Sequence, residues 1–477
     1  MLLVLDIGSS SVRASLWSER AEPAGEMVKL PYQRREAPGG VAEVDPMELL
    51  ELTASAVDQA LVGGAEVTGV ATSTMWHCLL GLDSHGEPVT PVYTWADRRG
   101  VDAAAGLRDR LDEAAVHART GCPLHSSYWP AKLAWLREAE PERFAKVAAW
   151  VSPAEHLQRV VFGDAPVSTS LASATGLFVQ HPREWDSELT ELLGVRETLP
   201  PIDDTPRSGL RGEWATRWPA LREVPWYPPT GDGASSNVGA GCATPDREAL
   251  MIGTSGALRV CWEADDVPVP EGLWSYRADA RRVVTGGALS DGGSVIAWLR
   301  RLTRLPEAEE AERAIAAMAP DSHGLTMVPL LSGERGPGWA DGARAAITGL
   351  SLATEPIHLL RAGMEAVALR FALTDRLLDC ALPGERRVIG TGGGLVASPA
   401  WTQIIADALG HPVTASAVEE ASSRGAALLA LEASGQIEAL EAIEAPEGET
   451  FEPDSAATEV YGRALERQRS LYEATVD

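Results

Sequence analysis

The chain has 477 residues, enough for two or three domains that each bury a core. Its formal charge of -27 at pH 7 argues against general affinity for nucleic acid or anionic membranes. Five scattered cysteines without a Cys-x-x-Cys pair indicate neither a disulfide framework nor a zinc site. The start carries no basic leader and no apolar run approaches membrane-spanning length, so we expect a cytoplasmic protein.

The chain opens with a predicted hairpin, in which an apolar strand reaches the turn Ile7-Gly8-Ser9-Ser10-Ser11 and returns to Trp17. Asp45 and Pro46 then form a typical N-cap and first residue of a helix. Residues 67–71 indicate a strand that enters the loop 72–77, a position where open α/β sheets bind ligands.

Residues 78–230 mix helical and irregular patterns. Apolar spacing predicts helices over 103–115 and 131–149. The hydroxyl-rich residues 168–178 favour the close approach of another group over a packed helix. Residues 197–230, rich in Pro, Trp and Arg, are expected to be connecting structure.

Asp232 lies between two glycines in a small-residue loop, where a ligand can approach the backbone closely. It is well placed as a catalytic base, and the alternative is a turn residue that caps its own backbone. An apolar strand then breaks at Gly253-Thr254-Ser255-Gly256 and returns to Trp262. This second hairpin repeats the Ile-Gly-hydroxyl-Ser turn of the first, which indicates two halves of similar design with a ligand between them.

The remaining pattern is again strand and helix in alternation. We expect strands over 283–287, 325–331 and 411–414, and helices over 294–302, 355–378 with Thr354 as cap, and 421–434. Between them, a strand from Arg387 ends in Gly392-Gly393-Gly394, and Ser398 caps a helix that stops at Gly410. An acidic, loop-like tail over 438–454 precedes a last amphipathic helix.

In the order of these motifs the whole chain resembles the FGGY carbohydrate kinases, and its most specific match is the C-terminal signature over 392–410. The segments 75–83, 93–98 and 170–176 resemble the gluconokinase subgroup. The resemblance implies an α/β fold of two actin/hexokinase-like (ribonuclease H-like) domains, 1–243 and 244–477, with a cleft between them. No lysine stands in a Gly-x-x-x-x-Gly-Lys motif, so a P-loop nucleotide site is excluded.

The resemblance also implies the cofactors ATP and Mg²⁺, with Asp232 as the base that accepts the proton of a sugar hydroxyl. Asp6 would hold Mg²⁺, or else make an ordinary Asx turn. Arg13 would neutralise phosphate charge, or else be a solvated strand residue. The two turns would bind the phosphates through Ser9, Ser10, Ser11, Thr254, Ser255 and Gly256. Of the glycine triplet, Gly392 and Gly393 would face adenosine, with Gly394 admitting the packing of the helix.

Five side chains are the candidates for binding the sugar: Trp76, His77, Trp95, Asp97 and Arg98. His125 and Arg98 are the candidates for binding a carboxylate end. With fifteen tryptophans in the chain, the alternative for Trp76 and Trp95 is a role in the core. Closure of the two domains on both ligands is expected to exclude water.

The expected reaction is phosphorylation of a primary hydroxyl of a sugar acid, with gluconate giving 6-phosphogluconate. Two alternatives stay open: a kinase of xylulose or another polyol or ketose on the same frame, and an actin- or Hsp70-like ATPase switch without a sugar substrate. The expected partners are small molecules, with no nucleic acid or membrane, and a homodimer is compatible with the sequence.

Overall fold

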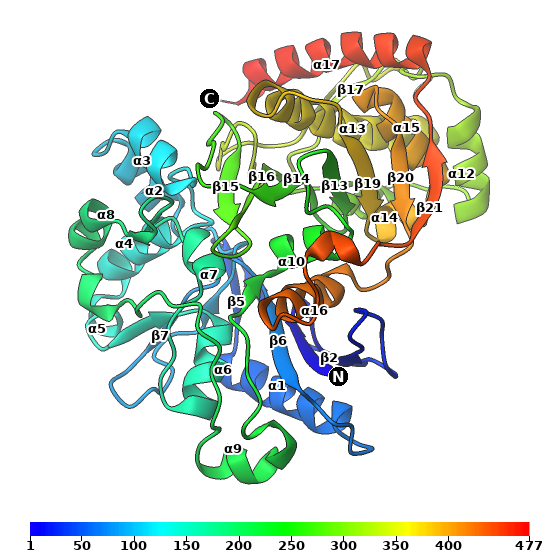
Figure 1. Cartoon of the computed structure of the whole chain (residues 1–477). Coiled ribbons are helices and arrows are strands. Elements are labelled where there is room, and N and C mark those ends of the chain that lie inside the picture. Colours follow the sequence, from blue (N-terminus) through cyan, green and yellow to red (C-terminus); the bar gives the residue numbers. More distant parts are fainter. Residues whose placement is uncertain (477) are drawn as a thin grey trace.

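The computed structural model describes residues 1–476 and has two large β-sheets, one in each half of the chain (Figure 1). The predicted α/β architecture is confirmed. Each sheet is built around one of the two predicted hairpins, and each hairpin has a parallel strand beside its first strand. The repeat seen in the sequence is therefore a repeat of structure.

The first sheet has five strands in the order β12-β6-β1-β2-β3. Its strands are Leu2–Ile7 (β1), Ser11–Trp17 (β2), Val28–Pro31 (β3), Gly69–Thr74 (β6) and Thr230–Gly231 (β12). Strand β6 runs parallel to β1, with Ser73 opposite Asp6, and β12 runs parallel to β6. The ends of β1, β6 and β12 therefore meet at one edge, which brings Asp232 to the same edge as Asp6.

The second sheet has seven strands in the order β15-β16-β14-β13-β19-β20-β21. Its strands are Arg247–Ile252 (β13), Gly256–Glu263 (β14), Trp274–Arg277 (β15), Arg282–Leu289 (β16), Arg387–Thr391 (β19), Val413–Ser416 (β20) and Glu447–Phe451 (β21). Strand β19 is parallel to β13, so the glycine triplet that follows β19 lies at the same sheet edge as the turn that follows β13.

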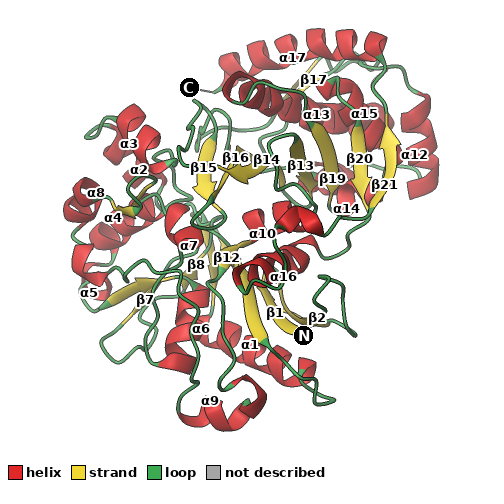
Figure 2. Cartoon of the chain, in the orientation of Figure 1, coloured by secondary structure: helices red, strands yellow, loops and turns green. Residues whose placement is uncertain are grey.

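Two helices lie between the sheets and two long helices cover their outer faces (Figure 2). Helix α1 (Pro46–Ala60) packs on the first sheet and α13 (Pro356–Ala381) on the second. Between the sheets, α10 (Asp232–Gly239) packs on β14, while α16 (Ala421–Ala433) crosses back to pack on β1 and β6. The central contact joins a helix of each half.

Further helices and small sheets surround this frame. In the first half they are β4 (Arg35–Ala37), β5 (Val41–Val44), β7 (Leu80–Leu82), β8 (Val92–Tyr93), α2 (Val101–Arg108), α3 (Glu113–Thr120), α4 (Trp129–Ala139), α5 (Pro141–Phe144), β9 (Ala149–Val151), α6 (Pro153–Phe162), α7 (Thr169–Ser173), β10 (Phe178–Val179), β11 (Glu184–Trp185), α8 (Ser187–Leu193), η1 (Arg196–Thr198), α9 (Gly212–Arg217) and η2 (Pro219–Leu221). In the second half they are α11 (Gly293–Leu302), α12 (Ala308–Ala317), β17 (Thr326–Val328), β18 (Ala346–Thr348), α14 (Gly393–Val396), α15 (Pro399–Leu409), η3 (Leu440–Ala442) and α17 (Ser455–Thr475).

Several predicted boundaries are wrong, each for a local reason. The helix expected over 103–115 is two helices, α2 and α3, because Asp112 caps a new helix. The one expected over 131–149 ends before Pro141, which starts α5, and residues 149–151 form β9. The strand expected over 325–331 is only three residues long, and the long helix is capped by Glu355 rather than Thr354.

Four segments expected to be irregular hold regular structure. Ser168 caps the short helix α7 inside the hydroxyl-rich segment, with its Oγ accepting from Leu171 N. The loop expected after Ala71 is the end of β6, and the acidic tail contributes the edge strand β21. The residues after Gly231 are helix α10 rather than a loop.

Within residues 1–476, none of the helices combines the length and apolar character that crossing a membrane requires.

Candidate active site

Asp232 is the first residue of α10, and β12 delivers it to the edge of the first sheet. Its Oδ1 accepts a hydrogen bond from Gly233 N at 2.8 Å. Burial raises the pKa of the Asp232 carboxyl, the nearby Arg259 guanidinium lowers it, and the charge of Asp6 raises it. Asp232 therefore makes the self-capping contact weighed from the sequence, while its carboxylate remains in the electrostatic field of a second acid.

The two glycines beside Asp232 make room for a tryptophan. A Cβ on Gly231 would lie 1.9 Å from Nε1 of Trp76, and a Cβ on Gly233 would lie 2.3 Å from its ring. The buried indole donates from Nε1 to Ser170 O at 3.1 Å. The glycines thus serve a side chain of the protein rather than the approach of a ligand, and Trp76 fixes the backbone on both sides of Asp232.

Asp6 and the first turn lie beside Asp232 at the sheet edge. Arg13 Nη1 donates to Asp6 Oδ2 at 2.7 Å and lies 3.7 Å from Glu420, in the segment before α16. Burial raises the pKa of Asp6, and Arg13 lowers it. The predicted turn is closed by a hydrogen bond from Gly8 N to Ser11 O, with Ser9 and Ser10 exposed at its tip and Ser11 buried in β2.

The second turn is also closed by a backbone hydrogen bond, over one residue fewer. Gly253 N donates to Ser255 O at 3.0 Å, and Thr254 is exposed at the tip. The start of α11 lies against this turn, since Gly292 N and Ser294 N both donate to Thr254 O at 3.0 Å. Gly256 is buried in β14, where a Cβ would lie 2.6 Å from the ring of Phe371. Gly256 is thus a packing residue, and Thr254 and Ser255 present their polar groups at the turn.

The glycine triplet divides into two kinds of position. Gly392 has φ +93°, and a Cβ there would lie 2.4 Å from Ile252 O, while a Cβ on Gly394 would lie 2.9 Å from the Ile252 side chain. Gly393, by contrast, is exposed and a Cβ there would have no neighbour within 4 Å. Gly392 and Gly394 are therefore required by packing, and Gly393 leaves open space at the start of α14.

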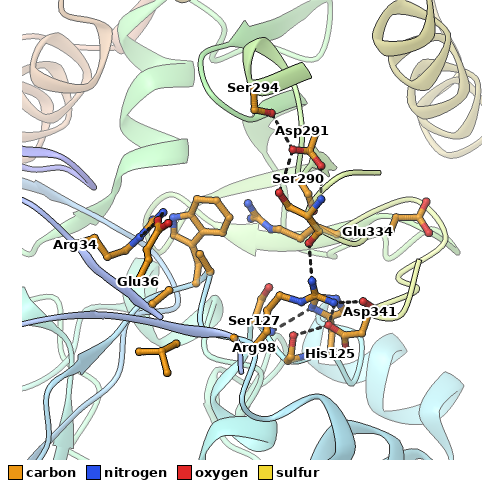
Figure 3. Close-up of a pocket in the computed structure, with 18 of the residues that line it drawn as sticks. Arg34, Glu36, Arg98, His125, Ser127, Ser290, Asp291, Ser294, Glu334 and Asp341 are labelled. Carbon is orange, nitrogen blue, oxygen red and sulfur yellow. Dashed lines mark hydrogen bonds and ion pairs between the residues drawn. The ribbon is translucent and has the colours of Figure 1, made fainter. Parts of the chain in front are cut away.

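A cavity of ≈ 270 Å³ lies between the two halves (Figure 3). Its lining includes candidate sugar-binding residues and Thr254 of the second turn. Figure 3 shows Arg34 and Glu36 on one side of it, and Arg98, His125 and Asp341 together on another. The side chains that line it come from both halves: Arg34, Glu36, Val41, Trp95, Arg98, His125, Ser126, Ser127, Thr254, Ser290, Asp291, Ser294, Ser332, Glu334, Arg335 and Asp341.

Of the predicted sugar residues, Trp95 and Arg98 line this cavity. The guanidinium of Arg98 is already engaged, since Nη1 donates to Ser332 O at 3.1 Å and Nη2 donates to Asp341 O. His125 also lines it, with Nε2 3.0 Å from Asp341 Oδ1. Arg98 and His125 thus hold the 332–341 loop of the second half against the first.

His77 and Asp97 are buried beside the cavity rather than on its lining. Nδ1 of His77 is 2.6 Å from Ala174 O, and because burial lowers the pKa of His77 the ring is neutral and donates from Nδ1. Both Asp97 oxygens are occupied, by Ala42 N and by the Arg99 guanidinium. Asp97 therefore braces the segment that carries Trp95.

The sequence did not single out four polar residues of this region. Arg259 lies on β14 beside Asp232, and burial lowers its pKa to about 10. Asp291, Arg335 and Asp341 lie on segments between the elements of the second half. None of them belongs to a local motif, and only the fold brings them to the cleft.

Comparison with known proteins shows one family along the chain. Residues 1–239 match the N-terminal domain and residues 249–434 the C-terminal domain of the FGGY family of carbohydrate kinases. A gluconokinase of Bacillus subtilis (strain 168) is 27% identical over 466 residues, covering 94% of this chain and 91% of that protein. A glycerol kinase of Acidovorax ebreus (strain TPSY) is 31% identical over 472 residues, covering 91% and 90%.

The fold agrees with these matches. The crystal structure of a ligand-bound xylulose kinase from Lactobacillus acidophilus superposes with a TM-score of 0.91 at 24% identity, covering 99% of this chain and 98% of that one. Both halves of the chain, the paired turns and the architecture agree with one assignment, and the chain belongs to the FGGY family of carbohydrate kinases, ATP-dependent phosphotransferases with an alcohol group of a small-molecule substrate as acceptor.

Proposed function

We propose that this enzyme transfers the γ-phosphoryl group of ATP to the primary hydroxyl of gluconate, giving 6-phosphogluconate and ADP. The observation that carries the proposal is the place of Asp232, at the start of a helix between the two sheets and within the field of Asp6. The segments that resemble gluconokinases, and a gluconokinase relative that spans 94% of the chain, support gluconate as the acceptor.

In this proposal Asp232 accepts the proton of the hydroxyl as its oxygen attacks the γ-phosphorus. A bond forms between that oxygen and phosphorus, and the bond from phosphorus to the β,γ-bridging oxygen breaks as ADP leaves. Thr254 and Ser255 on one side, and Ser9 and Ser10 on the other, supply hydroxyl and N–H donors to the phosphates. We place the boundary between the two domains near residue 243, in the connection from α10 to β13.

A magnesium ion fits the acids beside the first turn. The charge of Asp6 raises the pKa of Asp232, and the buried Ser11 Oγ has no hydrogen-bond partner among the described residues. Mg²⁺ prefers carboxylate and water oxygens, so Asp6 would hold it through water. When bound, the ion neutralises charge that develops on the transferred phosphoryl group. Arg13, paired with Asp6, contributes a second positive charge at this position.

The substrate is tested by ADP release from the purified enzyme with gluconate, xylulose, glycerol and no acceptor. We expect gluconate to give the highest kcat/KM. The glycerol kinase relative and the xylulose kinase structure make the other two acceptors the strongest alternatives. Highest kcat/KM with xylulose or glycerol would reject gluconate, and ADP release that no acceptor stimulates would reject the kinase reaction.

The position of the nucleotide is tested at the glycine triplet. Gly393→Val is expected to raise the KM for ATP by about tenfold without lowering the melting temperature, because the new side chain fills open space that we assign to adenosine. Gly392→Ala is the matched control, expected to lower the melting temperature because of its positive φ and the contact with Ile252 O. An unchanged KM for ATP in Gly393→Val would place the nucleotide elsewhere.

A further inference from the structure

The charged side chains that line the cavity are almost all engaged by neighbours, in ion pairs or hydrogen bonds. Arg34 pairs with Glu36, and Arg98 donates to two backbone carbonyls. The carboxylates of Asp291, Glu334 and Asp341 are engaged as well, with the following partners: Ser294 and Ser332 for Asp291, Arg370 and Tyr472 for Glu334, and His125 and Ser126 for Asp341.

Arg335 is the exception. Its guanidinium makes no hydrogen bond and no ion pair with any residue in the range 1–476, and its Nε is buried. The carbon at the centre of the guanidinium lies 4.4 Å from the ring centre of Trp95. The residue is half-buried, and a guanidinium whose Nε is buried without an acceptor has lost a hydrogen bond to water that an anion bound there would replace.

The loop around Arg335 is held by contacts with both halves, so the backbone that carries the guanidinium is fixed. The preceding residue, Glu334, accepts from Tyr472 Oη at 2.6 Å and from Gly338 N at 3.1 Å. Further along the loop, Asp341 accepts from Ser126 Oγ at 2.5 Å. These contacts fix the loop in front of and behind Arg335 and leave its own donors free.

The surroundings of Arg335 indicate where its ligand lies. Arg335 lines the cavity between the two halves together with Trp95 and with Thr254 of the second turn. Trp95 lies under the guanidinium and also lines the cavity, so it adds apolar surface beside the space for a polyol chain. A planar guanidinium matches a carboxylate in two parallel hydrogen bonds.

We infer that Arg335 binds the carboxylate of the sugar acid, while the hydroxyl at the other end of the sugar acid contacts Asp232. Arg335 therefore selects sugar acids over neutral polyols. This inference rests on the proposed function, since it concerns the acceptor of the same reaction. Arg335 is in this view a substrate-binding residue that determines specificity, supplied by the second half of the chain to a sugar held mainly by the first.

The test compares kcat/KM for gluconate with kcat/KM for sorbitol, which has a CH₂OH group in place of the carboxylate. In Arg335→Leu we expect the preference for gluconate to fall by about 10–100-fold, as the loss of a charged hydrogen-bonding partner predicts, with the KM for ATP within about threefold of the wild type. Arg335→Lys should retain part of the preference, because it keeps the charge and loses the planar fork.

Arg34→Leu is the matched control. Arg34 also lies over Trp95, at 5.8 Å, but its charge is neutralised by Glu36. The preference of the Arg34→Leu enzyme for gluconate over sorbitol should change by less than about threefold, because no uncompensated charge is removed. Calorimetric binding of gluconate to each variant, with thermal melting as a check on folding, gives the same comparison without turnover.

Three results would overturn the inference. One is an unchanged preference and affinity for gluconate in Arg335→Leu. Another is a loss of ATP affinity instead, which would assign Arg335 to the phosphates. The third is a wild-type enzyme that prefers neutral polyols, which would reject the proposed substrate as well. A wild-type preference for a different sugar acid, lost in Arg335→Leu, would reject gluconate and leave the role of Arg335 standing.

Discussion

Asp232→Asn should lower kcat by about 10²–10⁴-fold and leave the affinity for ATP close to that of the wild type. The amide has nearly the same shape and can still accept the hydrogen bond from Gly233 N, so the start of α10 is retained. It cannot accept the proton of the attacking hydroxyl, however. The loss should therefore appear in kcat, measured by coupled ADP release, while equilibrium binding of ATP is unaffected.

Ser236→Ala distinguishes an effect of the lost Asp232 carboxylate from an effect of a displaced Arg259. Ser236 lies one turn further along α10, and its Oγ accepts from Arg259 Nη2 at 3.2 Å. If the effect of Asp232→Asn came from a displaced Arg259, then Ser236→Ala would reproduce it. We expect Ser236→Ala to keep kcat within about threefold, because a single exposed or half-buried hydrogen bond contributes little. Near-normal turnover in Asp232→Asn would show that another group is the base.

The parts of the fold that the sequence predicts well depend on local rules. The two hairpins follow from apolar strands that flank a glycine and hydroxyl turn, and the register of each is fixed within a few residues. Helix α15 begins at the Ser398 cap and ends at Gly410, which takes φ +73°. Such signals lie within one turn of the element that they control, so tertiary contacts do not override them.

The features that the sequence does not predict depend on contacts between distant residues. The glycines around Asp232 suggested space for a ligand. That space is filled by Trp76, which lies about 155 residues before Gly231 in the sequence. The hydroxyl-rich segment before Phe178 forms α7 because Ser168 caps it and its small side chains are buried. Arg335 lies in an irregular loop. Its surroundings, Trp95 among them, come from distant parts of the chain, so only the fold shows that its charge is unpaired.

The contact between α10 and α16 connects the base to the second half of the molecule. Helix α10 carries Asp232 at its first residue, and α16 follows Glu420, which lies near the Asp6–Arg13 pair. The two helices approach so closely that backbone meets backbone. Any movement of the two sheets relative to each other must therefore be transmitted through this crossing, which makes its geometry important for the alignment of the acid and the phosphates.

Gly425→Ala should destabilise the enzyme by about 1–3 kcal/mol or more, because the new methyl group overpacks this crossing. A Cβ on Gly425 would lie 1.8 Å from Ser235 O and 2.8 Å from Gly239 N, both backbone atoms that cannot turn aside. Gly462→Ala is the control: it lies within α17 with no atom within 4 Å of the added methyl, so it should be neutral or stabilising. Urea unfolding of the two variants measures the difference, and equal midpoints would show that α10 and α16 are not in backbone contact. Because Ser235 is on the helix that carries Asp232, Gly425→Ala should also lower kcat at temperatures well below its own melting transition.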